Sequence, residues 1–201
     1  MAWFAYDRAT ALADRFGLDG PVRRWAATRD EIGAEILSRG YDPDRNTFTQ
    51  SYGSAALDAG ALMIPLVGLL PGTDPRVTGT IDAIRAELGH DGLLSRYSTD
   101  ATDDGLSGTE GQFLACSFWL VDALAVNGRR DEARSLFERL LTLANDVGLC
   151  AEEYAVARGR QVGNFPQAFT HLALVNAART LDDPDHRPFA PADVRRSPAP
   201  G

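Results

Sequence analysis

The sequence contains few of the residues that mark disulfide-rich or metal-binding proteins. Its two cysteines, Cys116 and Cys150, are too few for a disulfide framework and too far apart for a zinc-binding pattern. Each lies in an apolar stretch, where a free cysteine packs as a small hydrophobic residue. The three histidines, His90, His171 and His186, are isolated from one another along the chain. We therefore expect no metal and no cofactor, and we expect a reduced, cytoplasmic setting, with which the cysteine content is compatible.

Long hydrophobic runs and basic patches are also missing. No apolar segment reaches the roughly 18 residues that a transmembrane helix needs, and the N-terminal stretch lacks the basic start and cleavage site of a signal peptide. The formal net charge is −8 at pH 7, and the arginines are scattered among aspartate and glutamate. Because nucleic-acid-binding proteins usually carry a basic stripe or patch, the sequence argues against a nucleic-acid partner as well as a membrane partner.

The sequence does contain helical periodicity along most of its length. Hydrophobic residues make up 44% of the chain, an ordinary proportion for a globular core, and they recur every three to four residues. Helix start and stop signals divide this pattern, as where Asp74 and Pro75 precede a periodic run that Gly89 ends. About seven helices are predicted from these signals, at residues 3–16, 21–40, 55–70, 75–88, 112–128, 130–146 and 166–181.

The links between these helices predict their arrangement. Asn127 and Gly128 favour a tight antiparallel helical hairpin, whose second helix has an inner face of Ala133, Leu136, Phe137, Leu140, Leu141 and Ala144. Residues 55–70 are apolar on nearly every side and predict a deeply buried helix, which Pro65 bends, and residues 46–54 predict a short extended piece or loop. Helices this apolar need partners on both sides, so a layered or toroidal all-α array is expected. Residues 184–201 are rich in proline and predict a disordered tail.

Several polar clusters are better explained as ordinary surface. The aspartates of "TDATDDG" (99–105) and "LDDPD" (181–185) lie in a link and a tail without an ordered ligand pattern, so solvated charge is expected there. His171 lies within the last predicted helix and is expected to be a structural histidine with its hydrogen bonds satisfied. The chain has no glycine-rich phosphate loop and no nucleophile elbow.

The remaining polar residues of interest lie in two predicted loops. They combine carboxylates, an arginine and aromatic rings: Arg96, Tyr97 and Glu110 in the long link before the fifth helix, and Glu152, Glu153 and Tyr154 in the break before the last. A sugar pocket uses these side chains, since carboxylates transfer protons, arginine binds hydroxyls and aromatic faces contact the ring. An exposed glutamate is nevertheless usually only solvated, so the residue types alone leave both interpretations open.

The stretch "GTEGQFLACSFWLVDALAVNGRRDEARSLFERLLTLANDVGLCAEEY", followed by "GNFPQAFTHLALVNAA", resembles the C-terminal part of glycoside hydrolase family 15. This family includes glucoamylases, glucodextranases and bacterial trehalases. The similarity extends back through "SYGSAALDAGALMIPLVGLLPGTDPRV" to Met1. It implies that residues 1–183 form the C-terminal portion of a catalytic domain, with the fold of a partial (α/α)6 toroid of antiparallel helical hairpins, and that the substrate is a small α-glucoside or oligosaccharide.

The resemblance also implies roles for individual residues. Family members invert the anomeric carbon with two carboxyl groups, a protonated acid and an ionised base, about 6.5–9.5 Å apart. The base is the first glutamate of an "E-[EQ]-Y" element, which falls on Glu152, so that Glu153 becomes a neighbouring polar contact and Tyr154 orients the site. Ala155 stands where the family usually has an aspartate.

The other elements of the family pattern fall on the long link. Arg96 and Tyr97 match an "RY" element whose arginine contacts sugar hydroxyls, and Glu110 opens an "EG-x-F" turn that supports the same pocket. The family's general acid belongs to a "W-E-x-R" stretch shortly before the segment that matches "MAWFAYDRA", and this chain starts at that "MAW". We therefore expect a chain that supplies the base without the acid and is inactive alone on trehalose or maltose-type substrates. The alternative is a non-catalytic helical interaction module, or a half-toroid that needs a partner chain carrying the missing toroid half.

Overall fold

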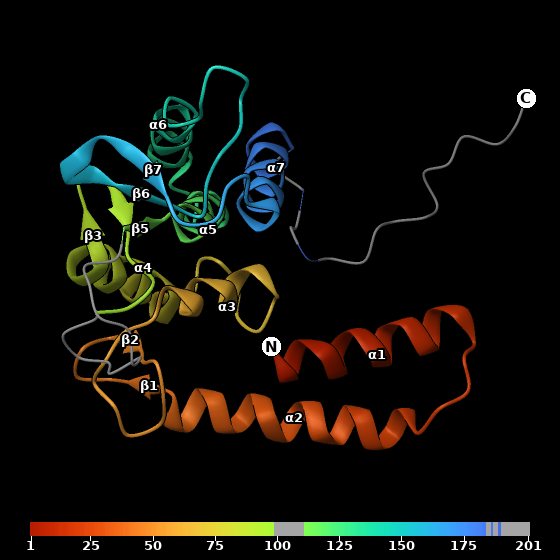
Figure 1. The fold of residues 1–201 in the computed structure, drawn as a ribbon. Helices are drawn as coiled ribbons and strands as arrows, with labels where there is room; N and C mark the ends of the chain where they lie inside the picture. The colour runs from red at the N-terminus through yellow and green to blue at the C-terminus, as the bar shows by residue number, and fades with distance from the viewer. Residues whose placement is uncertain (99–110, 184–185, 187–188, 190–201) are drawn as a thin grey trace, which may run out of the picture.

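The computed structural model describes residues 1–98, 111–183, 186 and 189 (Figure 1). This part of the chain is mostly helical, which confirms the predicted all-α class. The helices are α1 (Ala2–Phe16), α2 (Val22–Arg39), α3 (Met63–Leu66), α4 (Pro75–Leu88), α5 (Leu114–Val126), α6 (Arg130–Leu141) and α7 (Ala168–Asp182), with short 3-10 helices at Ala59–Leu62 and Val156–Arg158. The strands, of two or three residues each, are β1 (Tyr41–Asp42), β2 (Thr47–Phe48), β3 (Gly89–His90), β4 (Leu93–Leu94), β5 (Gln112–Phe113), β6 (Glu153–Ala155) and β7 (Arg160–Val162).

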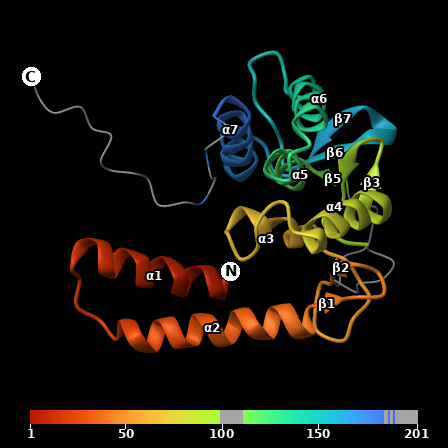
Figure 2. The same cartoon turned by 180° about the vertical axis from the view of Figure 1, so that it is seen from behind.

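The first two helices form an antiparallel hairpin along one side of the molecule (Figures 1 and 2). Gly17 ends α1 in the left-handed conformation, with φ of 62°, and its N–H bonds the carbonyl of Ala13. The helices approach closely at Gly33, where an added Cβ would lie 3.0 Å from Nε1 of Trp3. Gly17 ends α1, and Pro21 and Gly40 flank α2, so the helices predicted at residues 3–16 and 21–40 are confirmed.

Helix α5 is the centre of the core. Of its 13 residues, 11 are buried, and α3, α4, α6 and α7 all pack against it. Asn127 and Gly128 close the predicted hairpin between α5 and α6, and the Asn127 side chain donates to the carbonyl of Gly72 at 2.7 Å. The inner face predicted for α6 is correct at Ala133 and Leu140, which are buried, but wrong at Leu141, whose side chain is exposed.

The long buried helix predicted at residues 55–70 is wrong. The chain forms the 3-10 turn Ala59–Leu62 and then the single turn α3. Asp58 starts the 3-10 turn by accepting a hydrogen bond from the Gly60 N–H at 2.6 Å. Pro65 has no N–H to donate to a helical hydrogen bond. Three residues later, Gly68 adopts a φ of 83°, which is outside the helical range. Apolar content therefore predicted burial for part of this segment but not its conformation.

A small antiparallel sheet replaces the loop predicted before the last helix. β6 pairs with β5 through Phe113 and Glu153, and with β7 through Glu153 and Val162. Strands this short leave no detectable alternation in a sequence, which explains why none was predicted. The sheet order is β5-β6-β7, so residues shortly before α5 lie beside residues shortly before α7.

The C-terminal tail lies largely outside the described residues. Within it, the ring of Phe189 contacts the ring of Phe4 edge-to-face, with centroids 6.0 Å apart. Among the described helices, none combines the length and the apolar content needed to cross a membrane.

One buried carboxylic acid makes the core sensitive to pH. Asp122 in α5 is 1% exposed, and its Oδ1 has no hydrogen-bond partner among the described residues. Burial raises the pKa of Asp122 to about 7, an effect that a hydrogen bond with Thr180 opposes. The folded state therefore holds a proton that the unfolded chain releases at lower pH, so this group's contribution to stability falls as pH rises from about 4 to about 7.

We expect Asp122→Asn to remove this pH dependence. Relative to the parent chain, the variant should gain on the order of 2–3 kcal/mol between pH 5 and pH 8, since each unit of pKa difference is worth about 1.4 kcal/mol. Urea unfolding at the two pH values measures the change, and any constant cost of the new amide cancels in the comparison. Asp14→Asn, at an exposed position of α1, is the control. Equal pH dependence in the Asp122 variant and the parent would contradict the assignment.

Candidate functional site

A cavity of about 300 Å³ opens where α5, α7 and the 3-10 turn after Asp58 meet. Polar and aromatic side chains share its wall, which is formed by Asp58, Gly60, Arg96, Phe113, Ala115, Cys116, Trp119, Glu152, Gln167, Phe169 and Thr170. The cavity therefore brings together two residues singled out in the sequence, Glu152 and Arg96, which are 56 positions apart along the chain.

The main chain around Glu152 is held on both sides. The Glu152 N–H donates to the carbonyl of Asn164 at 2.9 Å, and the Leu114 N–H donates to the carbonyl of Glu152 at 3.0 Å. One residue earlier, the Thr170 hydroxyl donates to the carbonyl of Ala151 at 3.0 Å. Glu152 is thus fixed between the start of α5 and the chain leading into α7.

Two side chains brace the segment that leads into Glu152. The Gln161 side chain accepts a hydrogen bond from the Ala151 N–H and donates to the carbonyl of Leu149 at 3.1 Å. His171 Nδ1 lies 2.7 Å from the carbonyl of Gln167, to which it donates, and its Nε2 accepts from the Cys150 N–H at 3.2 Å. His171 therefore has both ring nitrogens bonded, which confirms the structural role predicted for it.

The Glu152 carboxylate is bonded asymmetrically. Its Oε2 accepts hydrogen bonds from Asn164, at 2.8 Å from the side-chain Nδ2 and 3.3 Å from the backbone N. Its Oε1 has no hydrogen-bond partner among the residues that the structure describes. The side chain is half-buried and lines the cavity, so one oxygen is anchored while the other is available to a ligand or water.

Arg96 and Asp58 form another part of the cavity wall. Arg96 Nε lies 3.9 Å from Asp58 Oδ2, and 56% of the Arg96 side chain is exposed. The main chain fixes their relative position, because the Ala59 N–H donates to the Arg96 carbonyl at 2.8 Å and Tyr97 forms a β-bridge with Asp58. The Arg96 guanidinium lies 5.7 Å from the centroid of the Tyr97 ring. This wall offers a cationic donor next to a carboxylate acceptor.

Aromatic rings and a thiol complete the lining. Trp119 and Phe169 contact each other edge-to-face, with centroids 5.6 Å apart, and Phe113 lies on the same wall. Burial raises the pKa of the Cys116 thiol to about 12, so this cysteine is an uncharged part of the wall. Rings beside fixed polar groups suit a ligand with apolar faces and polar edges, a description that fits a sugar.

Not every residue predicted for the site lines this cavity. Glu153 lies on β6, accepts a hydrogen bond from the Gly111 N–H at 2.8 Å and lines a separate cavity of about 610 Å³. Tyr154 packs against the hydrophobic core. Tyr97 supports Arg96, and Glu110 lies outside the described residues. The roles of these four residues toward a substrate stay predictions.

Sequence reasoning missed several residues of the wall. Asp58, Trp119 and Phe169 lie within predicted helices and were not considered as site residues. Asp58 could have been found, because it is the one charged residue within 55–70, and a charge inside an apolar run needs a partner. Trp119 could not, since most residues around it in α5 are apolar and it carries no separate signal.

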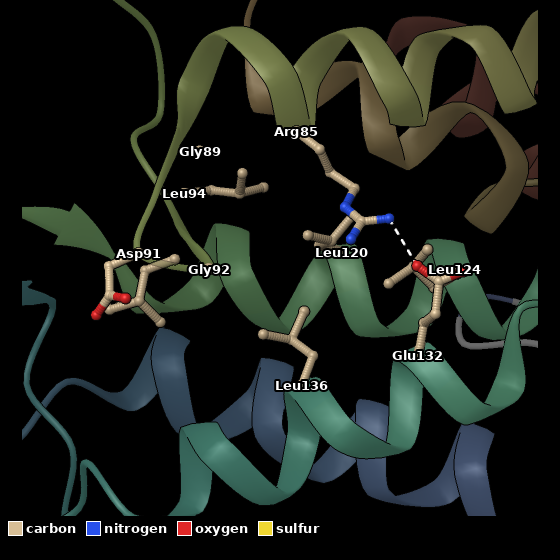
Figure 3. A pocket seen from close by; sticks show the side chains of 10 residues that line it. Arg85, Gly89, Asp91, Gly92, Leu94, Leu120, Leu124, Glu132 and Leu136 are labelled. Atoms are coloured by element: carbon tan, nitrogen blue, oxygen red, sulfur yellow. Dashed lines mark hydrogen bonds and ion pairs between the residues drawn. The ribbon is translucent and has the colours of Figure 1, made fainter.

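A further cavity, of about 310 Å³, lies between α4, α5 and α6 (Figure 3). Leu120, Leu124 and Leu136 line it, and Arg85 Nη1 bonds Glu132 Oε2 at 2.8 Å across one side. Hydrogen bonds from Arg129 and then Arg85 lower the pKa of Glu132 to about 2. Its charged groups are thus neutralised in ion pairs, which is typical of a structural surface. No group of three or more potential metal ligands occurs among the described residues.

The paired helices and the cavity lined by carboxylates and aromatic rings define a helical domain with a candidate ligand site. In agreement, residues 1–179 match the family model "Glycosyl hydrolases family 15". The chain belongs to glycosyl hydrolase family 15.

Individual relatives and solved structures support the same assignment. The chain is 52% identical over 177 residues to a trehalase of Mycobacterium tuberculosis, covering 88% of this chain and 26% of that protein. It is 41% identical over 184 residues to a trehalase of Thermoplasma volcanium, covering 91% of this chain and 29% of that protein. The chain thus spans less than a third of the length of these curated relatives.

Among solved structures, a wild-type glycosidase superposes with a TM-score of 0.68 at 22% identity, covering 82% of this chain and 46% of that one. A glycosidase variant in complex with glucose superposes with a TM-score of 0.69 at 21% identity over the same shares of the two chains. At this identity the similarity concerns the fold, and it agrees with the expected partial (α/α)6 toroid.

The two cysteines give a direct test of how closed the site is. Burial raises the pKa of both thiols, and only a thiolate reacts rapidly with iodoacetamide. We expect no labelling of Cys116 or Cys150 in the native chain at pH 7.5, and two labels per chain after unfolding in guanidinium. Mass spectrometry of the intact protein counts the labels. Rapid labelling of native Cys116 would contradict the packing of this wall.

Proposed function

We propose that this chain is part of an inverting α-glucoside hydrolase acting on trehalose or maltose-type substrates, with Glu152 as the general base. The observation that carries the proposal is the Glu152 carboxylate, which lines the cavity with one oxygen anchored and the other available. Arg96 and the aromatic wall supply groups suited to a sugar ring. Two relatives at 52% and 41% identity are named trehalase, which supports trehalose as the first substrate to test.

The geometry suits a single displacement at the anomeric carbon. Water attacks this carbon from the face opposite the leaving oxygen, and the water proton passes to Oε1 of Glu152. The bond from carbon to the leaving oxygen breaks as a second carboxyl group, in its acid form, protonates that oxygen. Arg96 is placed to bind a sugar hydroxyl, and Trp119 or Phe169 to contact the ring face. The new hydroxyl therefore has the opposite configuration.

The second carboxyl group is not among the described residues of this cavity. The carboxylate next to Arg96 is Asp58, whose Oδ1 accepts the Gly60 N–H at 2.6 Å to start the 3-10 turn. This bond gives Asp58 a structural role in the turn. On this proposal the described part of the chain supplies the base, Glu152.

We expect the 201-residue chain alone to hydrolyse neither trehalose nor maltose at a useful rate. General acid catalysis is worth about 10²–10⁴-fold in rate, and no residue assigned that role lies among those described in the cavity wall. Glucose release measured with a coupled assay, at high protein concentration and over hours, tests this. Turnover at the rate of an ordinary trehalase would contradict the proposal.

A hybrid enzyme tests Glu152 directly. In it, residues 1–179 of this chain replace the matched segment of the Mycobacterium tuberculosis trehalase, an exchange that 52% identity permits. Glu152→Gln should lower kcat for trehalose by about 10²–10⁴-fold while KM changes little, since the amide cannot accept the water proton.

Glu153→Gln is the matched comparison for this experiment. Glu153 lines the separate cavity of about 610 Å³, so the Glu153→Gln variant should lose much less kcat than Glu152→Gln. Similar losses in the two variants, or a loss below about tenfold for Glu152→Gln, would place the base elsewhere.

A non-catalytic module that needs a partner chain is the second candidate. The observation in its favour is an apolar stripe on α7, where Phe169, Leu172 and Val175 are 54%, 63% and 52% exposed. A partner carrying the other toroid half would cover such a stripe. Size-exclusion chromatography with light scattering separates the possibilities. A monomer with a cooperative melting transition argues against a required partner, whereas soluble aggregates fit a fragment of a larger catalytic domain.

A further inference from the structure

We propose that Asn164 is a positioning residue that fixes the orientation of the Glu152 carboxylate for its role as the base. It holds Oε2 and leaves Oε1 to face the cavity and accept the proton from water. This inference rests on the proposed role of Glu152. It adds Asn164, a residue that the sequence analysis did not assign to the site.

The contacts between the two residues are reciprocal. Asn164 donates twice to the same carboxylate oxygen, from Nδ2 at 2.8 Å and from the backbone N at 3.3 Å. In return, the Glu152 N–H donates to the Asn164 carbonyl at 2.9 Å. Because both donors meet one oxygen, turning the carboxylate out of this plane would break both bonds. The orientation of the group is therefore fixed as well as its position.

Gly163 makes room for this arrangement. Its φ of 78° is left-handed, and an added Cβ would lie 3.2 Å from both Cβ and Oε2 of Glu152. A side chain at this position would press on the carboxylate from the side on which Asn164 holds it. The pair Gly163 and Asn164 thus forms a cradle, in which the glycine supplies space and the asparagine supplies donors.

The side chain of Asn164 is not needed to hold the loop. Main-chain bonds persist without it, from Glu152 N to the Asn164 carbonyl at 2.9 Å and from Gln167 N to the Cys150 carbonyl at 3.0 Å. Asn164 is also exposed, and exposed hydrogen bonds contribute little to stability. Truncating this side chain should therefore affect the carboxylate more than the fold.

The hybrid enzyme described above is the setting for the test, with trehalose and α-glucosyl fluoride as substrates. The fluoride leaves without protonation: the bond from the anomeric carbon to fluorine breaks, water forms the new bond, and its proton passes to Glu152. We expect Asn164→Ala to lower kcat on both substrates by about 10- to 100-fold, the size of effect that a misplacement near 1 Å produces. KM should change little, since the substrate contacts remain.

Matched controls separate positioning from folding. Asn176→Ala, on α7 and outside this cavity lining, should leave kcat unchanged. The melting temperature of the 201-residue chain should be the same with and without Asn164→Ala. If that variant melts much lower, Asn164→Asp decides the question, because it keeps the side-chain size, removes the donor and adds a like charge. It should lose at least as much kcat.

The outcomes distinguish this inference from the proposed function. If Asn164→Ala keeps the parent kcat while Glu152→Gln is strongly impaired, positioning by Asn164 is refuted and Glu152 remains the base. A raised KM with unchanged kcat would also refute it, since Asn164 would then act on substrate binding. If Glu152→Gln itself retains activity, the proposed function fails and this inference with it.

Discussion

The hydrogen bonds of the main chain from Cys150 to Glu152 determine where the site lies. This segment accepts or donates bonds on both sides, to Leu114 at the start of α5 and to the chain that leads into α7. Had it been an ordinary surface loop, Glu152 would have been solvated. Because it is tied to two helices that pack on each other, its side chain lines a cavity whose other walls those helices also provide.

The buried helix α5 provides the other half of this constraint. With 11 of 13 residues buried, it presents only a few side chains to the cavity, namely Ala115, Cys116 and Trp119. The charged groups, Asp58, Arg96 and Glu152, come from segments outside the α-helices. Enzymes usually place their functional residues on loops that a rigid scaffold of helices or strands holds in position. In this chain the hydrogen bonds of Asn164 also hold one oxygen of the Glu152 carboxylate.

The sequence predicted the elements whose signals are local. Helix α4 begins after Asp74 and ends before Gly89 because capping and chain reversal depend on neighbouring residues. Residues 55–70 were mispredicted because apolar content shows burial but not whether the chain is helical. Glu152 and Arg96 were found through family resemblance, and their shared cavity could not be inferred from spacing, since the β5-β6-β7 sheet that sets it has strands too short to leave a pattern. The contact between Asn164 and Glu152 joins residues 12 positions apart, and no sequence signal marked it.

Azide rescue tests the central claim, that Glu152 activates the nucleophile, most directly. The experiment uses the hybrid enzyme carrying Glu152→Ala, with α-glucosyl fluoride as substrate and sodium azide added. Azide needs no base and fits the space that the carboxylate leaves, so its nitrogen can bond the anomeric carbon as fluoride departs. We expect azide to restore turnover, and we expect NMR to identify the product as β-glucosyl azide. Failure of azide to raise the rate, or formation of the α-azide, would contradict it.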